Sequence, residues 1–431
     1  MPNTSAQLEP VRLDPPPARR SIFRESAFQR VFAAAAISEL GTQTSYVAIP
    51  LVAVVALRAS AADVGVLAAL STLAFLVIGL PVGAWVDRMR RRGVMVAADL
   101  VRAALLASVP PAAWLGALSM AQMYAVVLLT GAATVFFDVA KLSYLPHIVG
   151  RDRLEDANAR LVMLDATGDV GGRGAGGYLA QVLTAPVAVG VDALTYLWSA
   201  VCLIGIRGRE PRTRPETRPR LVRDVREGVR YVLGHRILRP IVLEGACTNL
   251  SVRLSVTMLP VVLVRGLGMS GTVLGLFLAS GGVGLMAGSL AARPVVRWLG
   301  RGRALWISSL ALAPAAFAVP LVGHGVWLWI AGAGWLLSSA KIGMDNVVKV
   351  TFRQRVTPDA MLGRMNATFR FLLMGALTVA GLLAGVLGAS AGARAVLWLG
   401  AAVPAVSWLL LFCSPLRRLR ELPAAPAAPA D

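Results

Sequence analysis

Residues 62–92 read ADVGVLAALSTLAFLVIGLPVGAWVDRMRRR. From Val64 to Val86 it contains no charged residue, which is enough length for a helix that needs about 20 apolar residues to cross a bilayer. Arginines then crowd into the positions from Arg88 to Arg92. A basic loop directly after a spanning helix is typical of the cytoplasmic side of a membrane. The stretch therefore predicts a transmembrane helix that ends at the cytoplasmic face.

The same apolar pattern recurs along the whole chain of 431 residues. It is 56% hydrophobic and 15% charged, with a mean hydropathy of +0.67. Soluble proteins carry about 25% charged residues, so the composition argues against a water-soluble enzyme. Segments that span a bilayer in this way must be helices, because the hydrocarbon offers the backbone no water. We therefore predict an all-α membrane protein with twelve transmembrane helices in two pseudo-symmetric six-helix halves, at about 31–57, 62–86, 94–117, 121–145, 160–184, 187–206, 240–264, 271–292, 304–323, 326–350, 364–388 and 393–414.

The polar segments outside these helices define the predicted domains. The first residues are rich in proline and arginine and lack the apolar core of a signal peptide. The predicted order is a disordered cytoplasmic tail (1–29), an N-terminal six-helix bundle (30–206), a basic cytoplasmic linker (207–239), a C-terminal six-helix bundle (240–414) and a second cytoplasmic tail (415–431).

The charge distribution predicts the orientation. The formal net charge is +20, yet the predicted outer loops contain Arg58, Arg265 and Arg394 as their basic residues. This asymmetry follows the positive-inside rule, so the charge does not indicate a nucleic-acid partner. We expect a monomer in the lipid bilayer of the bacterial plasma (inner) membrane, with both termini in the cytoplasm.

Several functional classes lack the residues that they need. None of the lysines, Lys141, Lys341 and Lys349, follows a glycine, so the chain has no phosphate-binding P-loop. The histidines are scattered, and the three cysteines lie in apolar stretches, which predicts neither a metal site nor a disulfide framework. We expect no enzymatic activity, no cofactor and no metal.

The two halves share features at a nearly constant offset. The small-residue motif at 79–83 recurs 205 residues later at 284–288, and the motif at 172–176 recurs 209 residues later at 381–385. Small residues four apart let helices approach closely. Duplicated six-helix halves with a central pathway are typical of secondary transporters that work by alternating access.

The motifs resemble those of the major facilitator superfamily, in particular its bacterial drug-efflux and product-export branch, which includes macrolide and siderophore exporters. Residues 83–92 are similar to the Gly-x-x-x-Asp-Arg-x-x-Arg-Arg signature of that superfamily. Similar motifs of the branch occur at 136–140, 192–196 and 362–368. The resemblance implies a secondary active transporter that exports a small amphiphilic compound, such as a drug, natural product or siderophore.

The resemblance also implies a cytoplasmic gate. In that reading Asp87 faces the N-terminus of the eleventh helix, which attracts an anion, and Arg91 pairs with Asp138. These links would hold the outward-facing state together. The alternative is a solvated charge run that only sets the orientation. The predicted gate residues are Gly83, Asp87, Arg88, Arg91, Arg92 and Asp138.

Charged residues inside the predicted helices are candidates for function, because each costs about 3 kcal/mol or more unless it is paired or solvated. Fifteen such residues are Glu39, Asp99, Arg102, Asp138, Lys141, Asp165, Asp169, Arg173, Asp192, Glu244, Arg253, Lys341, Asp345, Lys349 and Arg370.

Two helices carry three such charges at i, i+4 and i+8, a spacing that puts them on one face. The stripes predict a substrate cavity lined by Asp165, Asp169, Arg173, Lys341 and Asp345. All the lysines of this arginine-rich chain lie in spanning segments, and we expect Lys141 and Lys349 to form a basic collar at the inner mouth. The alternative is that the acids of each helix simply neutralise their neighbouring cations.

A carboxylate inside a spanning helix can also bind the coupling proton. The predicted coupling residues are Glu39, Glu244 and Asp345, with a salt bridge from Glu39 to Arg173 or Arg253 as the alternative. Embedded lysines and an arginine favour an anionic or zwitterionic amphiphile as substrate. The predicted function is export by proton antiport; an uptake symporter, a lipid flippase and a non-transporting receptor or scaffold are the alternatives.

Overall fold

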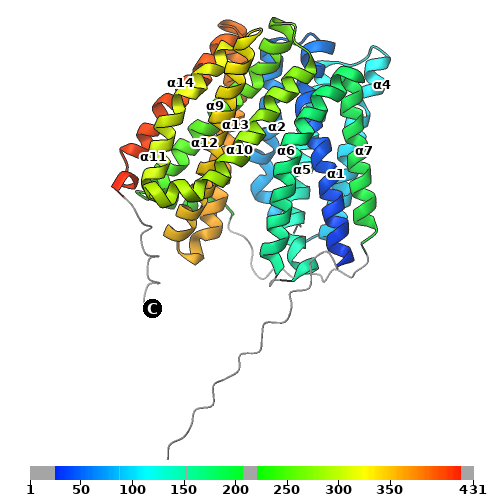
Figure 1. The fold of residues 1–431 in the computed structure, drawn as a ribbon. Coiled ribbons are helices and arrows are strands. Elements are labelled where there is room, and N and C mark those ends of the chain that lie inside the picture. Colours follow the sequence, from blue (N-terminus) through cyan, green and yellow to red (C-terminus); the bar gives the residue numbers. More distant parts are fainter. Residues whose placement is uncertain (1–24, 87, 151–152, 207–220, 419–431) are drawn as a thin grey trace, which may run out of the picture.

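The computed structural model describes residues 25–86, 88–150, 153–206 and 221–418 (Figure 1). Within these ranges the secondary structure is helical, without a β-strand. Ten helices are long and apolar enough to cross a membrane. Two more, α6 (Leu154–Val182) and α12 (Val326–Val356), are as long but carry embedded charges. Together these helices account for the twelve predicted spans.

The N-terminal half begins earlier than predicted. Its first helix starts at Ser26, so residues 26–29 are helical and not part of a disordered tail. Its elements are α1 (Ser26–Leu51), η2 (Val52–Ala56), α2 (Ala61–Val86), α3 (Arg91–Ala107), α4 (Val109–Trp114), α5 (Met120–Val149), α6 and α7 (Ala185–Ile204).

The C-terminal half repeats this order of helices. Its last helix is followed by a short 3₁₀ turn, η6 (Pro415–Arg418). Its elements are α9 (Leu238–Pro260), η4 (Val261–Gly266), α10 (Gly271–Leu299), α11 (Arg301–Leu312), η5 (Ala313–Leu321), α12, α13 (Asp359–Ser390) and α14 (Ala393–Phe412).

One local irregularity reveals the internal repeat. Helix α1 contains Pro50 close to its end and continues into the π-helical turn η2. Helix α9 ends at Pro260 and continues into the π-helical turn η4. Proline lacks the N–H that an α-helix needs, and a π turn is a widened helical turn that relieves such an interruption. The first helix of each half therefore ends in the same way.

The bundle has two sides that differ in charge. Helix α1 begins at the bottom of Figure 1, on the side where α2 ends and α3 begins. We call this the basic side, because the arginine-rich loop 88–92 lies there. The other side carries the short connections between α1 and α2 and between α9 and α10, and we call it the opposite side.

The two halves pack together on the opposite side. Helix α2 packs on α13, and α6 packs on α10. At these crossings Gly65 faces Gly385 and Gly177 faces Gly275, and an added Cβ at either Gly65 or Gly177 would collide with the facing backbone. Small residues permit this close approach of two helices. The halves are therefore closed on this side.

Part of the basic linker between the halves is helical, which the sequence did not lead us to predict. It contains the helix α8 (Leu221–Gly234), which packs on α13. Glu227 of α8 forms an ion pair with Arg364 at 3.0 Å, and a hydrogen bond from Arg223 lowers the pKa of the Glu227 carboxyl. His235 follows directly; its Nδ1 accepts the backbone N–H groups that begin α9, and burial lowers the pKa of its imidazole. The linker thus fixes the start of the C-terminal half.

Candidate functional site

A cavity of about 240 Å³ lies in the N-terminal half and reaches α9 of the C-terminal half. Its walls are mainly apolar and come from α1, α2, α3, α5, α7 and α9. On α2 the lining residues run from Val64 to Phe75, so the cavity occupies the middle and the opposite part of the bundle. Apolar walls with a few polar groups are typical of a small-molecule site. The five residues predicted for the substrate cavity are not among its lining residues.

Arg253 of α9 brings a positive charge to this cavity. Its Nη2 donates to the Ala68 carbonyl oxygen and to the Ser71 hydroxyl, both on α2 of the other half. Its Nε is buried and has no hydrogen-bond partner. No ion pair of the described residues involves Arg253. The guanidinium therefore joins the halves without a neutralising acid.

Asp192 of α7 is the acidic residue that lines this cavity. Its side chain is 1% exposed, lines the same cavity, and accepts a hydrogen bond from the Thr195 hydroxyl at 3.0 Å. Next to it the Tyr196 and Thr42 hydroxyls form a hydrogen bond of 2.9 Å. Our sequence-based site omitted Asp192, although the motif at 192–196 was a signal that pointed to it.

A neutral ion pair lies behind this wall. Arg102 is paired with Asp99 on the same helix, and the Ser199 hydroxyl donates to Asp99 at 2.6 Å. The Arg102 guanidinium lies 4.2 Å from the centre of the Tyr196 ring. Cations are attracted to aromatic faces at such distances. This cluster fixes the α3–α7 contact and holds Tyr196 at the cavity.

The charged stripe of α6 faces α1. Arg173 forms an ion pair with Asp169 at 2.7 Å and donates to the Gln43 side chain at 3.1 Å. The amide of Gln43 in turn donates to Glu39 at 2.8 Å. The Arg173 guanidinium also lies 4.8 Å from the centre of the Tyr46 ring, which lines the cavity. Arg173 is therefore compensated and lies directly behind the cavity wall.

Glu39 differs from the other predicted coupling residues. It is half-buried, its hydrogen bond comes from the neutral amide of Gln43, and no ion pair of the described residues involves it. Glu39 forms neither of the alternative salt bridges. Gln43 lies between Glu39 and Arg173, and Arg253 donates to Ala68 and Ser71 of α2. Asp165 of the same stripe as Arg173 is exposed.

Four charged residues form a buried quartet in the C-terminal half. Glu244 of α9, which is fully buried, contacts the ammonium groups of both Lys341 and Lys349 of α12. Asp345 lies 2.6 Å from Lys341 and 2.9 Å from Lys349. Two acids thus balance two cations. Lys349, predicted in a basic collar, belongs to this neutral quartet, whereas Lys141 lies 3.8 Å from Asp138.

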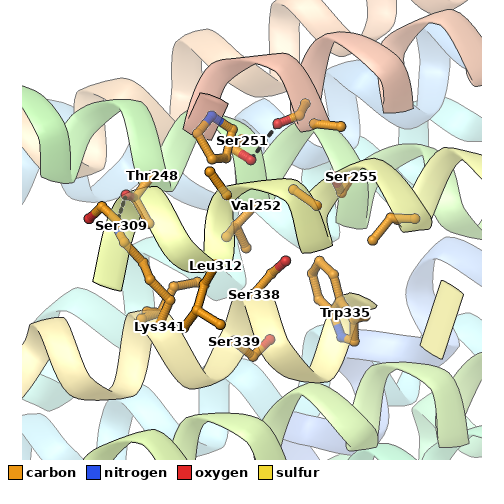
Figure 2. Close-up of a pocket in the computed structure, with 17 residues that line it drawn as sticks. Thr248, Ser251, Val252, Ser255, Ser309, Leu312, Trp335, Ser338, Ser339 and Lys341 are labelled. Carbon is orange, nitrogen blue, oxygen red and sulfur yellow. Dashed lines mark hydrogen bonds between the residues drawn. The ribbon is translucent and has the colours of Figure 1, made fainter. Parts of the chain in front are cut away.

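A second, smaller cavity of about 50 Å³ adjoins this quartet between α9, α11, η5, α12 and α14 (Figure 2). Lys341 lines it, together with the serine hydroxyls labelled in Figure 2. The hydroxyls of Ser309 and Ser338 are buried there without a hydrogen-bond partner in the protein. A polar cavity of this size is large enough for an ordered water.

Of the predicted gate residues that the structure describes, Arg91 and Arg92 have contacts with other parts of the N-terminal half. Asp87 lies outside the described residues. The Arg91 guanidinium is 2.6 Å from Nε2 of His147, and Arg92 donates to the Leu203 carbonyl oxygen at 2.8 Å. Arg88 is exposed, and Gly83 has open space beside it. The implied pairing of Arg91 with Asp138 stays a prediction for a conformation that is closed on the basic side.

The described residues contain no cluster of histidine, cysteine or acidic side chains suited to hold a metal ion. The cysteines of the chain are free thiols, and each lies in a helix or next to one.

Comparison with known proteins gives a consistent result. The family model described as Major Facilitator Superfamily matches residues 31–347. The enterobactin exporter EntS of Escherichia coli O1:K1 / APEC is 26% identical over 417 residues, which cover 92% of this chain and 94% of that protein. The multidrug efflux pump Tap of Mycolicibacterium fortuitum is 29% identical over 188 residues, 42% of this chain and 46% of Tap. A bacterial homologue of the iron transporter ferroportin, crystallised in the inward-facing state, shares the fold with a TM-score of 0.71 at 16% identity, over 91% of this chain and 99% of that one.

Proposed function

Because the chain belongs to the major facilitator superfamily, we propose that this membrane transporter exports a small amphiphilic compound from the bacterial cytoplasm by proton antiport. The compound is a drug, a natural product or a siderophore. Two relatives support this direction, since EntS is an exporter of enterobactin and Tap is a multidrug efflux pump.

The closed opposite side supports uptake of the substrate from the basic side. The halves meet at glycines of the opposite side, and the positive-inside rule assigns the basic side to the cytoplasm. A central site that is closed on one side is what alternating access requires. In this conformation the cavity next to Arg253 would therefore receive its substrate from the cytoplasm or the inner leaflet.

The environment of Glu39 is the observation that supports proton coupling. The embedded acids Glu244 and Asp345 each contact two lysines, and losing such a partner would leave charge uncompensated. Glu39 has only the neutral Gln43 amide among its hydrogen bonds in the described chain. It can therefore change its charge without breaking an ion pair. A proton that arrives from outside would bind Glu39 after the substrate has left and would be released inside.

The test uses inverted membrane vesicles with a respiration-driven proton gradient and a fluorescent reporter of internal pH. Anionic natural products, siderophores, macrolides and lipophilic cations are added to the outside, which corresponds to the cytoplasm. We expect at least one compound to release protons from the wild-type vesicles. Glu39→Gln should abolish this release.

Glu227→Gln is the matched control, because it removes an exposed carboxylate of the linker and not one of a spanning helix. It should transport like the wild type. Proton release that survives in Glu39→Gln would move the coupling site elsewhere. No response to any compound, in protein that is shown to be folded, would contradict export by proton antiport.

A further inference from the structure

We infer that the substrate carries an anionic group, which Arg370 meets at the mouth of the 240 Å³ cavity and Arg253 binds within it. This inference rests on the proposed transport function and adds the chemical class of the substrate. It assigns the recognition of charge to two arginines of the C-terminal half that do not belong to the predicted cavity residues.

The embedded cations with acidic partners give no preference for an anion. Each of them is held within ion-pair distance of a carboxylate, so its charge is already offset. These pairs are Arg102 with Asp99, Lys141 with Asp138, Arg173 with Asp169, and Lys341 and Lys349 with Glu244 and Asp345. An anion that approached them would have to displace a carboxylate that is already paired. The charge that can select a substrate must therefore come from other residues.

Arg253 is free to accept such a group. Its present partners are a carbonyl oxygen and a hydroxyl of α2, and its buried Nε donates to no atom of the protein. A guanidinium presents five N–H donors in a planar fork, which suits a carboxylate, sulfonate or phosphate. A buried donor without a partner is costly, and a ligand oxygen beside it would remove that cost. Tyr46 of α1 lines the same cavity as this guanidinium.

Arg370 lies on the path to Arg253. It is exposed on α13, and its guanidinium lies 4.1 Å from the centre of the Phe75 ring. Phe75 is the lining residue of α2 that lies nearest the basic side. The acid that acts on Arg370 from across the bundle is Asp138, which is itself 3.8 Å from Lys141. A substrate that enters from the basic side would pass Arg370 before it reaches the cavity.

The acid of the cavity does not cancel these charges. Asp192 lies on the wall formed by α7, where Arg102 also acts on it. Arg253 lies on the wall formed by α9, and Arg370 on α13. The formal charges of these three residues, two arginines and one aspartate, sum to +1. Glu39, which acts on Asp192 from α1, is not among the residues that line the cavity. Tyr46, Phe75 and the aliphatic side chains between them offer an apolar surface for the rest of the molecule.

The experiment compares two probes of nearly the same shape. Purified protein in nanodiscs is titrated with the anionic dye 8-anilinonaphthalene-1-sulfonate and with its neutral counterpart N-phenyl-1-naphthylamine, and the fluorescence of empty nanodiscs is subtracted. A hydrogen-bonded charge pair contributes about 1.5–3 kcal/mol, so losing one should weaken binding about tenfold or more. We expect this loss for the sulfonate in Arg253→Gln and in Arg370→Gln, and a change of less than about twofold for the neutral probe. Arg253→Lys should retain part of the affinity, because it keeps the charge but not the fork.

Arg394→Gln is the matched control. Arg394 donates to the Val322 carbonyl oxygen on the opposite side and does not line the cavity, so both probes should bind to this variant as to the wild type. If Arg253→Gln does not fold, the test uses Arg370→Gln alone, because Arg370 is exposed. Equal weakening of both probes would mean that the cavity has lost its shape. That result, unchanged binding of the sulfonate, or no saturable binding of it by the wild type would each overturn the inference.

The binding and transport experiments together distinguish failure of the anion site from failure of proton antiport. Binding of the sulfonate through the two arginines without any proton release would keep the anion site and contradict antiport. Proton release that is as strong with lipophilic cations as with anions, together with unchanged sulfonate binding in both variants, would keep the transporter and remove the anion site.

Discussion

Removing one charge from the buried quartet should destabilise the protein far more than removing two opposite charges. Glu244→Gln leaves two lysines against Asp345, a net charge of +1 where Glu244 is 0% exposed and Asp345 2%. Breaking a buried ion pair by removing one partner costs about 3–5 kcal/mol, because the remaining charge is uncompensated. Glu244→Gln combined with Lys349→Met restores neutrality and keeps the pair of Lys341 with Asp345 at 2.6 Å. We expect the double variant to lie within about 2 kcal/mol of the wild type.

The assay is unfolding by titration with dodecyl sulfate, followed by the fluorescence of the 10 tryptophans. Both single variants and the double variant form a thermodynamic cycle, which isolates the coupling between Glu244 and Lys349. Glu227→Gln serves as the surface control; its ion pairs with Arg223 and Arg364 are exposed, so it should change the unfolding free energy far less than either substitution in the quartet. Additive effects of the two substitutions would refute the reasoning, since they would mean that the quartet does not act as one neutral unit.

Three further predictions concern other parts of the fold. Burial lowers the pKa of the His235 imidazole, so the unfolded chain binds a proton at a higher pH than the folded chain does. The stability that depends on neutral His235 is therefore present above pH 6.5 and is lost at lower pH. Between pH 7.5 and 5.5 the melting temperature of His235→Gln should fall less than that of the wild type. Gly65→Val should push α2 away from Gly385 and open the opposite side, so a cysteine placed at Ser71 in a cysteine-free chain should react faster with an impermeant thiol reagent from that side. Ser338→Ala removes a buried hydroxyl that lines the smaller cavity, where we expect an ordered water; the unfolding free energy should drop by about 1 kcal/mol, whereas a gain would mean that the cavity is dry.

The fold was predictable because the bilayer imposes a simple pattern. Long apolar segments and basic loops predict twelve spans. Two of these, α6 and α12, were predicted as spans although their embedded charges make them less apolar than the other ten. The helix α8 was missed, because its arginines gave the segment the appearance of a polar linker. Its contact with α13 depends on long-range packing that the linker sequence does not display.

The candidate site was predictable only as far as neighbours on one helix determine it. The i, i+4 spacing brought Asp345 together with Lys341 and Lys349, and the structure has these contacts. The fourth member, Glu244, comes from α9, and its sequence neighbourhood makes it look isolated. Arg253 and Asp192 also lack a charged neighbour at helical spacing. A site predicted from charges at i, i+4 and i+8 therefore does not include them.

The position of Arg253 connects recognition with the change of conformation. Its guanidinium bonds to Ala68 and Ser71 across the contact between the halves, so the opposite side cannot open without breaking these bonds. An empty carrier that opened there would leave a guanidinium without partners, which is costly in a low-dielectric interior. An anionic group bound to Arg253 would replace the lost partners and lower that cost. A ligand shifts a conformational equilibrium only through its differential affinity for the two states. The substrate that Arg253 recognises is therefore the one that we expect to favour opening toward the opposite side, whereas a neutral compound of the same shape would fill the cavity without favouring the transition.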